Sequence, residues 1–198
     1  MITDTMVEKG LALTQADPQH DLKAGFRCRL LSSFDEPSGG VGQRRRTKLA
    51  TLAVEKVLPL WESLLPADHT PRQALDLAEK LLVGTVTLKD AERDMGRLWT
   101  HCDDLSWRLA DKQSVIMVGY GAVQVIREAM SQKHFGCEGV NDGSTDMDVD
   151  PYDHDSAFCA AIAYCGGPPW DEKSDAAKRL EFWTWWLTSA VRMATVIV

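Results

Sequence analysis

The sequence predicts an all-α protein, a single domain of about seven or eight packed helices with one long acidic loop. Apolar residues recur at three- and four-residue steps through most of the chain, which is the period of an amphipathic helix. Neither a β-hairpin signal nor a repeat of solenoid length stands out. The 198 residues suit one domain, and 44% hydrophobic residues suffice for a sizeable core. We therefore treat residues 1–198 as one helical domain.

The first helices are separated by a loop rich in glycine, proline and serine. Residues 4–34 predict one or two helices with a break near Asp17-Pro18, and the loop over 36–43 closes this N-terminal part, 1–43. A basic triplet, Arg44, Arg45 and Arg46, then begins an amphipathic helix. Pro59 lies inside this helix and predicts a kink or a break, because proline removes a backbone hydrogen bond and clashes with the preceding turn.

The next two helices are marked by residues typical of helix ends. Thr70-Pro71 places a proline at the first helical position, and Gly84 ends that helix. Thr87, followed three residues later by Asp90, resembles a capping box at the start of the helix after it.

Glycines give the main signals in the last third of the chain. A long helix over about 107–132 contains Gly119 and Gly121, which lower helix propensity and therefore indicate a close helix crossing. A short helix further on ends at Gly166-Gly167, and the last helix begins near Ser174. The final six residues, MATVIV, indicate a strand-like or frayed tail.

Negative charge is concentrated in one stretch, residues 134–172, which we call the acidic segment. The chain has 22 basic and 29 acidic residues, and this stretch has no Lys or Arg. Its nine acids are Glu138, Asp142, Asp146, Asp148, Asp150, Asp153, Asp155, Asp171 and Glu172. The segment therefore argues against a nucleic-acid surface at this place and favours a cation or a basic partner.

Three interpretations fit the acidic loop, residues 142–155. Asp146, Asp148 and Asp150 occupy the first three ligand positions of an EF-hand loop, but Pro151 and Ala157 stand where that loop needs Gly and Glu. A loosely held Ca²⁺ is one interpretation, and a partner-binding loop is another. The third, which the pattern favours, is a solvated loop whose Asp153 and Asp155 cap the next helix.

A metal-dependent phosphohydrolase of the HD type is the alternative enzymatic hypothesis. His154-Asp155 would supply the metal-binding pair, with His101 or His134 as the first ligand and Asp175 as the last. However, His20-Asp21 is an equally good copy of the two-residue motif. The sequence has no P-loop, H-E-x-x-H or G-x-S-x-G motif. We therefore predict no catalytic residue, no metal and no cofactor.

The basic triplet Arg44 to Arg46 has two interpretations. It is either a phosphate-binding cluster or a structural element that begins a helix and pairs with acids elsewhere, including those of the acidic loop. We favour the structural interpretation for all three arginines.

The cysteines predict reduced, mostly buried thiols. There are five of them, Cys28, Cys102, Cys137, Cys159 and Cys165, an odd number at wide spacing with no C-x-x-C. Their spacing does not match a zinc site. The sequence shows neither a secretory signal nor a stretch of about 18 apolar residues. We therefore expect a bacterial-type cytoplasmic protein without a membrane partner.

Three of the seven tryptophans lie in EFWTWWL, residues 181–187. At about 100° per residue, Trp183 and Trp186 share an apolar stripe with Phe182 and Leu187 and therefore belong to the core. Trp185 lies outside this stripe. It either packs under another segment, such as the acidic loop, or faces a partner.

Three stretches of the sequence together resemble a known family: RRRTKLATLAVEKVLPLW, DPYDHDSAFCAAIAYCGGPPWD and AAKRLEFWTWWL. They resemble family five of the all-helical immunity proteins of bacterial polymorphic toxin systems. The resemblance runs over residues 44–187, whereas 1–43 carry no match. It implies a cytoplasmic protein that binds a cognate toxin domain and blocks it without catalysis.

The resemblance and the charge pattern together give a hypothesis for the binding face. A concentrated acidic surface suits a basic toxin such as a nuclease, and tryptophan is enriched among interface anchors. The predicted partner-binding residues are Asp142, Asp146, Asp148, Asp150, Asp153, Asp155 and Trp185. A non-catalytic helical adaptor with another kind of partner remains the second alternative, beside the hydrolase.

Overall fold

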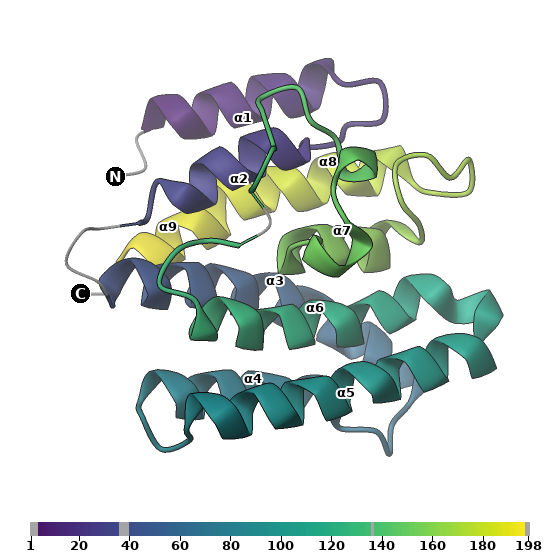
Figure 1. Cartoon of the computed structure of the whole chain (residues 1–198). Coiled ribbons are helices and arrows are strands. Elements are labelled where there is room, and N and C mark those ends of the chain that lie inside the picture. The colour runs from purple at the N-terminus through teal and green to yellow at the C-terminus, as the bar shows by residue number, and fades with distance from the viewer. Residues whose placement is uncertain (1–3, 36–39, 136, 197–198) are drawn as a thin grey trace.

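The chain is helical throughout most of its length in the computed structural model, which describes residues 4–35, 40–135 and 137–196 (Figure 1). Its α-helices are α1 Asp4–Ala16, α2 Ala24–Ser32, α3 Val41–Leu64, α4 Thr70–Leu82, α5 Leu88–Arg108, α6 Gln113–Met130, α7 Ser156–Cys165, α8 Ala176–Trp185 and α9 Val191–Thr195. The π-helical residues Trp186–Ala190 join α8 to α9. If α8, the π-helical residues and α9 are counted as one continuous helix, the described residues form eight helices. They contain no strand, as predicted.

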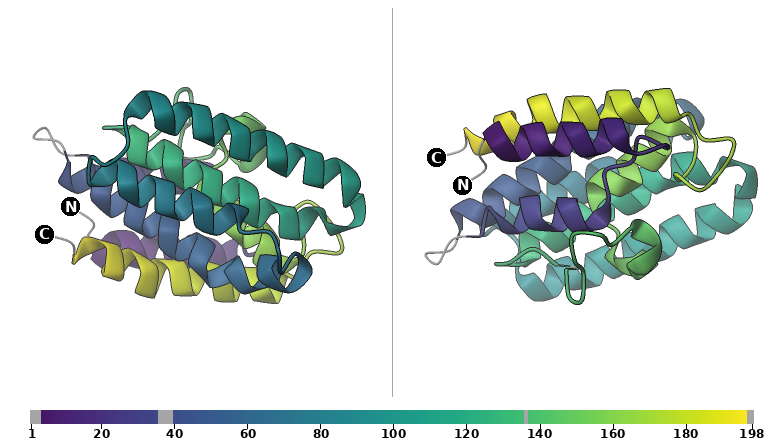
Figure 2. Two further views of the ribbon diagram at one scale, coloured as in Figure 1. Left: turned by 90° about the horizontal axis from the view of Figure 1, so that it is seen from below. Right: turned by 90° about the horizontal axis from the view of Figure 1, so that it is seen from above.

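The helices stack in layers around a central pair, α3 and α6. In Figure 1, α1, α2 and α8–α9 form the upper layer, α3, α6 and α7 the middle one, and α4 and α5 the lower one. The two further views show α5 and α4 side by side from below and α1 beside α8–α9 from above (Figure 2). Helix α6 contacts α3, α4, α5 and α7, so the core lies along it. None of the described helices is long and apolar enough to cross a membrane.

Close helix crossings occur at the two glycines of α6, as predicted. A Cβ atom at Gly119 would lie 2.7 Å from Cys102 Sγ and 2.8 Å from the ring of Trp61. At Gly121 it would lie 3.1 Å from Cys159 Cβ. Glycine therefore lets the backbone of α6 approach α3, α5 and α7 more closely than any other residue allows.

Most of the predicted helix ends are confirmed. Thr87 Oγ1 accepts a hydrogen bond from the Asp90 amide at 3.1 Å and caps α5. Asp155 accepts from the Phe158 amide at 2.9 Å and caps α7. Gly166 ends α7 with φ of +81°, a left-handed conformation that favours glycine. Helix α1 ends before Asp17-Pro18, as the break there predicted.

Three predicted boundaries are wrong. Pro59 does not break α3, because it and Glu55, whose carbonyl loses its amide partner, both lie on the exposed side of the helix. The other outcome that we predict for Pro59, a kink, stays a prediction. The long helix expected over 107–132 begins only at Gln113, since α5 continues to Arg108. The C-terminal tail is helical as far as Thr195, because burial of Ala194 in the core outweighs the strand preference of its neighbours. Residues 197 and 198 lie outside the described part.

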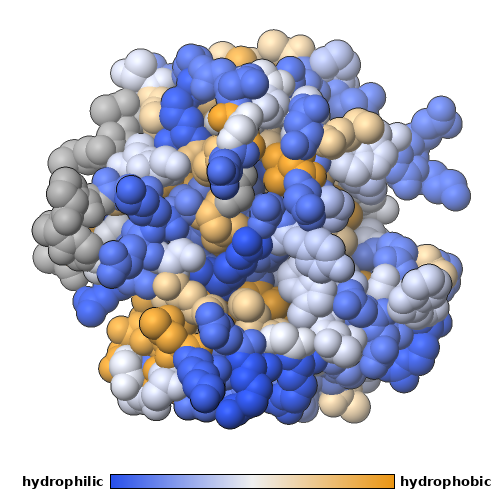
Figure 3. Space-filling view, viewed as in Figure 1, coloured by the Kyte–Doolittle hydropathy of each residue, from blue (hydrophilic) through white to orange (hydrophobic). Residues whose placement is uncertain are grey.

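The face that carries the acidic loop is mainly hydrophilic (Figure 3). On this face, apolar side chains gather at the lower left, where α4 turns into α5, and the exposed Val83 and Leu88 flank that turn. Exposed apolar residues are normal on a folded protein, because its polar surface does not suffice to cover it.

Candidate functional site

Arg27 of α2 fastens the acidic loop to the body of the protein. Its Nη1 and Nη2 donate to the two carboxylate oxygens of Asp146 at 3.0 and 2.5 Å, and its Nε donates to Asp155 at 2.8 Å. Nη1 also donates to the Leu22 carbonyl oxygen at 2.5 Å. The side chains of Arg27 and Asp146 are each 1% exposed. Two of the predicted partner-binding acids, Asp146 and Asp155, therefore form ion pairs inside the protein.

Aromatic rings and a third acid complete this buried network. The Arg27 guanidinium lies over the rings of Phe158 and Trp183, at 5.2 and 5.4 Å from their centroids. Trp183 Nε1 donates to Asp21 at 3.3 Å. Burial, together with the nearby charge of Asp146, raises the pKa of Asp21 to about 6. The network therefore holds a carboxyl group, that of Asp21, whose pKa lies well above that of an ordinary aspartate.

Two further acids of the loop are paired at the surface. Asp142 forms an ion pair with Arg29 of α2, and Asp153 one with Arg127 of α6 at 2.7 Å. Four of the nine acids in the acidic segment thus face arginines of the folded body. The segment presents less unpaired negative charge than its composition suggests.

The remaining two predicted acids are exposed and bonded only to the loop itself. Asp148 accepts from the amide and the hydroxyl of Thr145 at 2.8 and 2.9 Å. Asp150 accepts from the Tyr152 amide at 2.9 Å. Because Asp146, Asp148 and Asp150 each turn to a different partner, they do not converge on one point. The EF-hand interpretation of the loop is therefore wrong.

The candidate ligands of an HD-type hydrolase are dispersed as well. Each is bonded at a separate place: His154 to the Asp146 carbonyl oxygen, His101 to Asp68, His134 to Glu128, and Asp175 to the Lys178 amide at the start of α8. Within the described ranges, no potential metal-ligand group contains His154, Asp155 or Asp175. The geometry gives the hydrolase hypothesis no support.

The basic triplet lies at the start of α3, and its members have different surroundings. Arg46 is fully buried, donates to Glu128 through Nε and to the Ser131 carbonyl oxygen through Nη2, both at 2.9 Å, and pairs with Asp35. Arg45 is partly buried, and Arg44 is exposed. The acids that Arg46 binds lie outside the acidic loop. Arg46 thus ties α3 to the end of α6.

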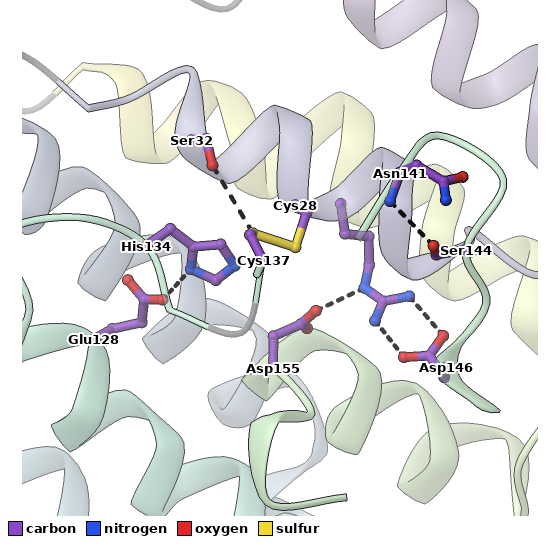
Figure 4. Close-up of a disulfide and its surroundings, with 10 residues drawn as sticks. Cys28, Ser32, Glu128, His134, Cys137, Asn141, Ser144, Asp146 and Asp155 are labelled. Carbon is purple, nitrogen blue, oxygen red and sulfur yellow. Dashed lines mark hydrogen bonds and ion pairs between the residues drawn. A yellow bond between two sulfur atoms is a disulfide. The ribbon is translucent and has the colours of Figure 1, made fainter. Parts of the chain in front are cut away.

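Two of the five cysteines form a disulfide, which corrects the prediction of reduced thiols. Cys28 of α2 and Cys137 after α6 are bonded across 109 residues, with Cα atoms 5.7 Å apart (Figure 4). Cys102, Cys159 and Cys165 are free and buried, and burial raises the pKa of Cys102 and that of Cys165 to about 12. The prediction holds for these three thiols alone.

The three clustered tryptophans divide between the core and the surface. Trp183 and Trp186 are fully buried, whereas Trp185 is partly exposed. The ring of Trp185 packs beside Phe182, and Lys56 Nζ lies 4.9 Å from its centroid. These contacts place Trp185 against α3 and its own helix, not under the acidic loop.

An aromatic cleft of about 790 Å³ opens on the surface of the described part of the protein. One side comes from α5 and the start of α6, the other from residues 151–154, α7 and the turn over 166–173. Five aromatic residues line it: Trp99, Tyr120, Tyr152, Phe158 and Trp170. Tyr152 stacks on Trp99 with centroids 5.3 Å apart, and Phe158 lies 6.1 Å from Trp170.

The cleft is open to solvent and carries a negative balance of charge. Tyr152 is 64% exposed and Trp170 is 50% exposed. Asp103, Asp111 and Asp171 line it, against the single cation Lys173. Asp103 accepts a hydrogen bond from the Tyr120 hydroxyl at 2.7 Å, and burial with this bond raises the pKa of Tyr120.

The sequence prediction missed this cleft, because its lining residues span 99–173 and share no periodic pattern. A signal was nevertheless present. Tyr152 lies in DPYD and Trp170 in PPWD, two parts of the stretches that carry the family resemblance. The predicted partner-binding set consists of six acids of the loop and Trp185, and it includes neither Tyr152 nor Trp170.

The fold and the cleft define an all-helical protein whose main surface feature suits binding. Its family is shown by direct comparison. The family model described as immunity protein Imm5 matches residues 7–193, and the chain belongs to this family. The match includes most of α1 and all of α2, so it extends beyond the predicted family region of 44–187. No curated protein matches the chain.

Proposed function

We propose that this protein binds and neutralises a cognate toxin domain of a bacterial polymorphic toxin system, and that this domain carries a basic surface. Membership of the Imm5 family supports the immunity role. The proposal carries with it a cytoplasmic location, where the toxin would act on the cell, and excludes nucleic acid and membranes as partners. Inhibition needs no catalytic group, because a bound protein can block a toxin by covering its active site or by holding it beside that site.

The observation that carries the proposal is the aromatic cleft. Two large side chains of its lining, Tyr152 and Trp170, are at least half exposed, and the buried Phe158 lines it as well. Tyrosine and tryptophan bury large areas at a small cost in side-chain entropy and dominate the binding energy of protein interfaces. A toxin side chain or turn that enters the cleft would cover these rings.

Charge supports a basic occupant. Three carboxylates and one ammonium group line the cleft, and the exposed Asp148 and Asp150 lie on the loop that leads to it. Complementary charge of this kind accelerates association and fixes the orientation of the partner. A nuclease, which must itself bind a polyanion, is the class of toxin that we expect.

The predicted partner-binding residues divide into two groups in this proposal. Asp148 and Asp150, with Asp142 and Asp153 in weaker roles because they are already paired, face the toxin. Asp146 and Asp155 hold the loop in place from the inside. We do not place Trp185 on this face. Lys56 lies over the rings of both Trp185 and Tyr164, and on α7 Tyr164 points to another side of the helix than the cleft residue Ile162.

A binding titration with the toxin domain encoded beside this protein tests the proposal. We expect a stable complex, loss of the toxin's activity within it, and an association rate that falls as salt screens the charges. A complex with a different partner and none with the toxin would favour the adaptor hypothesis.

A further inference from the structure

The disulfide lies beside a histidine in a group with the composition of a metal site. The sulfur atoms of Cys28 and Cys137 and a ring nitrogen of His134 all lie within 4.8 Å of one another. Among the residues that the structure describes, these three form the one group of His, Cys, Asp or Glu side chains with at least three members close enough to hold a metal ion. The group joins α2 to the chain that follows α6 (Figure 4).

The orientation of His134 is fixed by a buried carboxylate. Its Nδ1 is hydrogen-bonded to one oxygen of Glu128, whose other oxygen accepts from Arg46 Nε at 2.9 Å. In this contact the Glu128 carboxylate oxygen accepts and His134 Nδ1 donates. With the proton on Nδ1, the lone pair of the imidazole is on Nε2. In Figure 4 this second nitrogen points toward the two sulfur atoms.

This arrangement matches the surroundings of metal-binding histidines in general. Such histidines donate their other N–H to a carboxylate or a carbonyl group, which sets the tautomer and the ring orientation. The side chains of His134 and Glu128 are only 2% and 4% exposed. A buried, pre-oriented imidazole beside two cysteines has a ligand set that zinc and similar ions prefer.

We propose that Cys28, Cys137 and His134 bind one divalent transition-metal ion such as Zn²⁺ when the disulfide is reduced. A dithiol reductant supplies two electrons and two protons, the S–S bond breaks into two thiols, and the reductant leaves as a disulfide. The metal ion then displaces both thiol protons to solvent and binds the two thiolates and the Nε2 lone pair. A water molecule can complete the tetrahedron.

The metal and the disulfide exclude each other. Two thiolates at about 2.3 Å from a tetrahedral zinc ion lie about 3.8 Å apart, which is far longer than an S–S bond. Each state nevertheless links α2 to the chain after α6. The link would therefore persist in a reducing cytoplasm, where the disulfide alone would be lost.

Cobalt titration of the full chain tests the proposal. We expect the protein, reduced with a phosphine without oxygen, to bind one Co²⁺ per chain, with a thiolate-to-cobalt charge-transfer band and the visible absorption of a tetrahedral site, and to release it to Zn²⁺. The oxidised protein should bind none. Cys137→Ser should abolish the charge-transfer band, and His134→Ala should weaken binding by about 10- to 100-fold or more. Cys165→Ser and His154→Ala are the matched controls and should leave binding unchanged.

A second measurement uses only the unmodified chain, in case a variant does not fold. Zn²⁺ should protect Cys28 and Cys137 of the reduced protein from alkylation, as read by peptide mass spectrometry. The proposal is overturned if the reduced chain binds no Co²⁺, if Zn²⁺ leaves the alkylation of these two cysteines unchanged, or if binding depends on Cys165 instead.

Discussion

Arg27 and Asp146, 119 residues apart in the chain, form a bidentate ion pair that is almost completely closed to solvent. The pair joins α2 to the loop that carries Tyr152, and Arg27 also holds Asp155, the cap of α7. Both the loop and α7 contribute to the aromatic cleft. A contact made inside the protein therefore positions the surface that we propose for binding.

Replacement of Arg27 by methionine should be strongly destabilising. Asp146 and Asp155 would stay buried without their counter-ion, and breaking a buried pair in this way costs about 3–5 kcal/mol. Urea denaturation at neutral pH measures the loss. Arg29→Met is the control, because its pair with Asp142 is exposed and contributes at most about 1 kcal/mol. Equal losses in the two variants would refute the role assigned to Arg27.

The raised pKa of Asp21 predicts a pH dependence of stability. The folded state holds the proton up to about pH 6, whereas an unfolded chain loses it near pH 4. The stabilisation that protonation provides is therefore complete below about pH 4 and is lost as the pH rises toward 6. The Asp21→Asn variant should not show this loss of stability, because an asparagine side chain does not ionise.

The size of this pH effect follows from a comparison of the unmodified protein with the Asp21→Asn variant. Relative to Asp21→Asn, the unmodified protein should lose roughly 3 kcal/mol of unfolding free energy between about pH 4 and pH 7. Denaturation at a series of pH values measures the difference. Parallel curves for the two proteins would show that Asp21 is ionised in the folded state throughout this range.

Alanine at Gly119 should destabilise the crossing of α6 with its neighbours. The added Cβ would lie 2.7 Å from Cys102 Sγ, and overpacking of a filled core costs about 1–3 kcal/mol. Gly96 in α5 is the matched control, since a Cβ there would meet no atom within 4 Å. Gly96→Ala should stabilise the protein by about 0.5–1 kcal/mol through helix propensity. A neutral effect at Gly119 would mean that α6 can shift away from α5.

Neutralisation of Asp148 and Asp150 should slow toxin binding. The double Asn variant removes two exposed charges near the cleft, so the association rate should fall several-fold, by roughly 3- to 10-fold at low salt, and the two rates should converge at high salt. The control is Asp76→Asn with Asp90→Asn, which changes net charge equally at two residues of α4 and α5 that do not line the cleft. Stopped-flow kinetics distinguish local steering from an effect of net charge.

Local signals in the sequence predicted most of the helices, whereas the site depended on distant contacts. The Thr87 cap and the left-handed Gly166 are decided within a few residues, so their chemistry is visible in the sequence. The disulfide spans 109 residues, and the lining of the cleft spans 99–173. Such pairs are chosen by the way helices pack, which neither spacing nor composition reveals. For the same reason, the sequence does not reveal that four acids of the loop form ion pairs with arginines of α2 and α6.

The most direct test of the binding face compares two variants in their affinity for the neighbouring toxin domain. Tyr152→Ala with Trp170→Ala removes both exposed rings of the cleft, and Trp185→Ala removes a partly exposed ring elsewhere. Isothermal titration should show a loss of about 100-fold or more, roughly 3 kcal/mol, for the double variant and a change below about threefold for Trp185→Ala. The account would be contradicted if the double variant bound as tightly as the unmodified protein, or if only the loss of Trp185 weakened the complex.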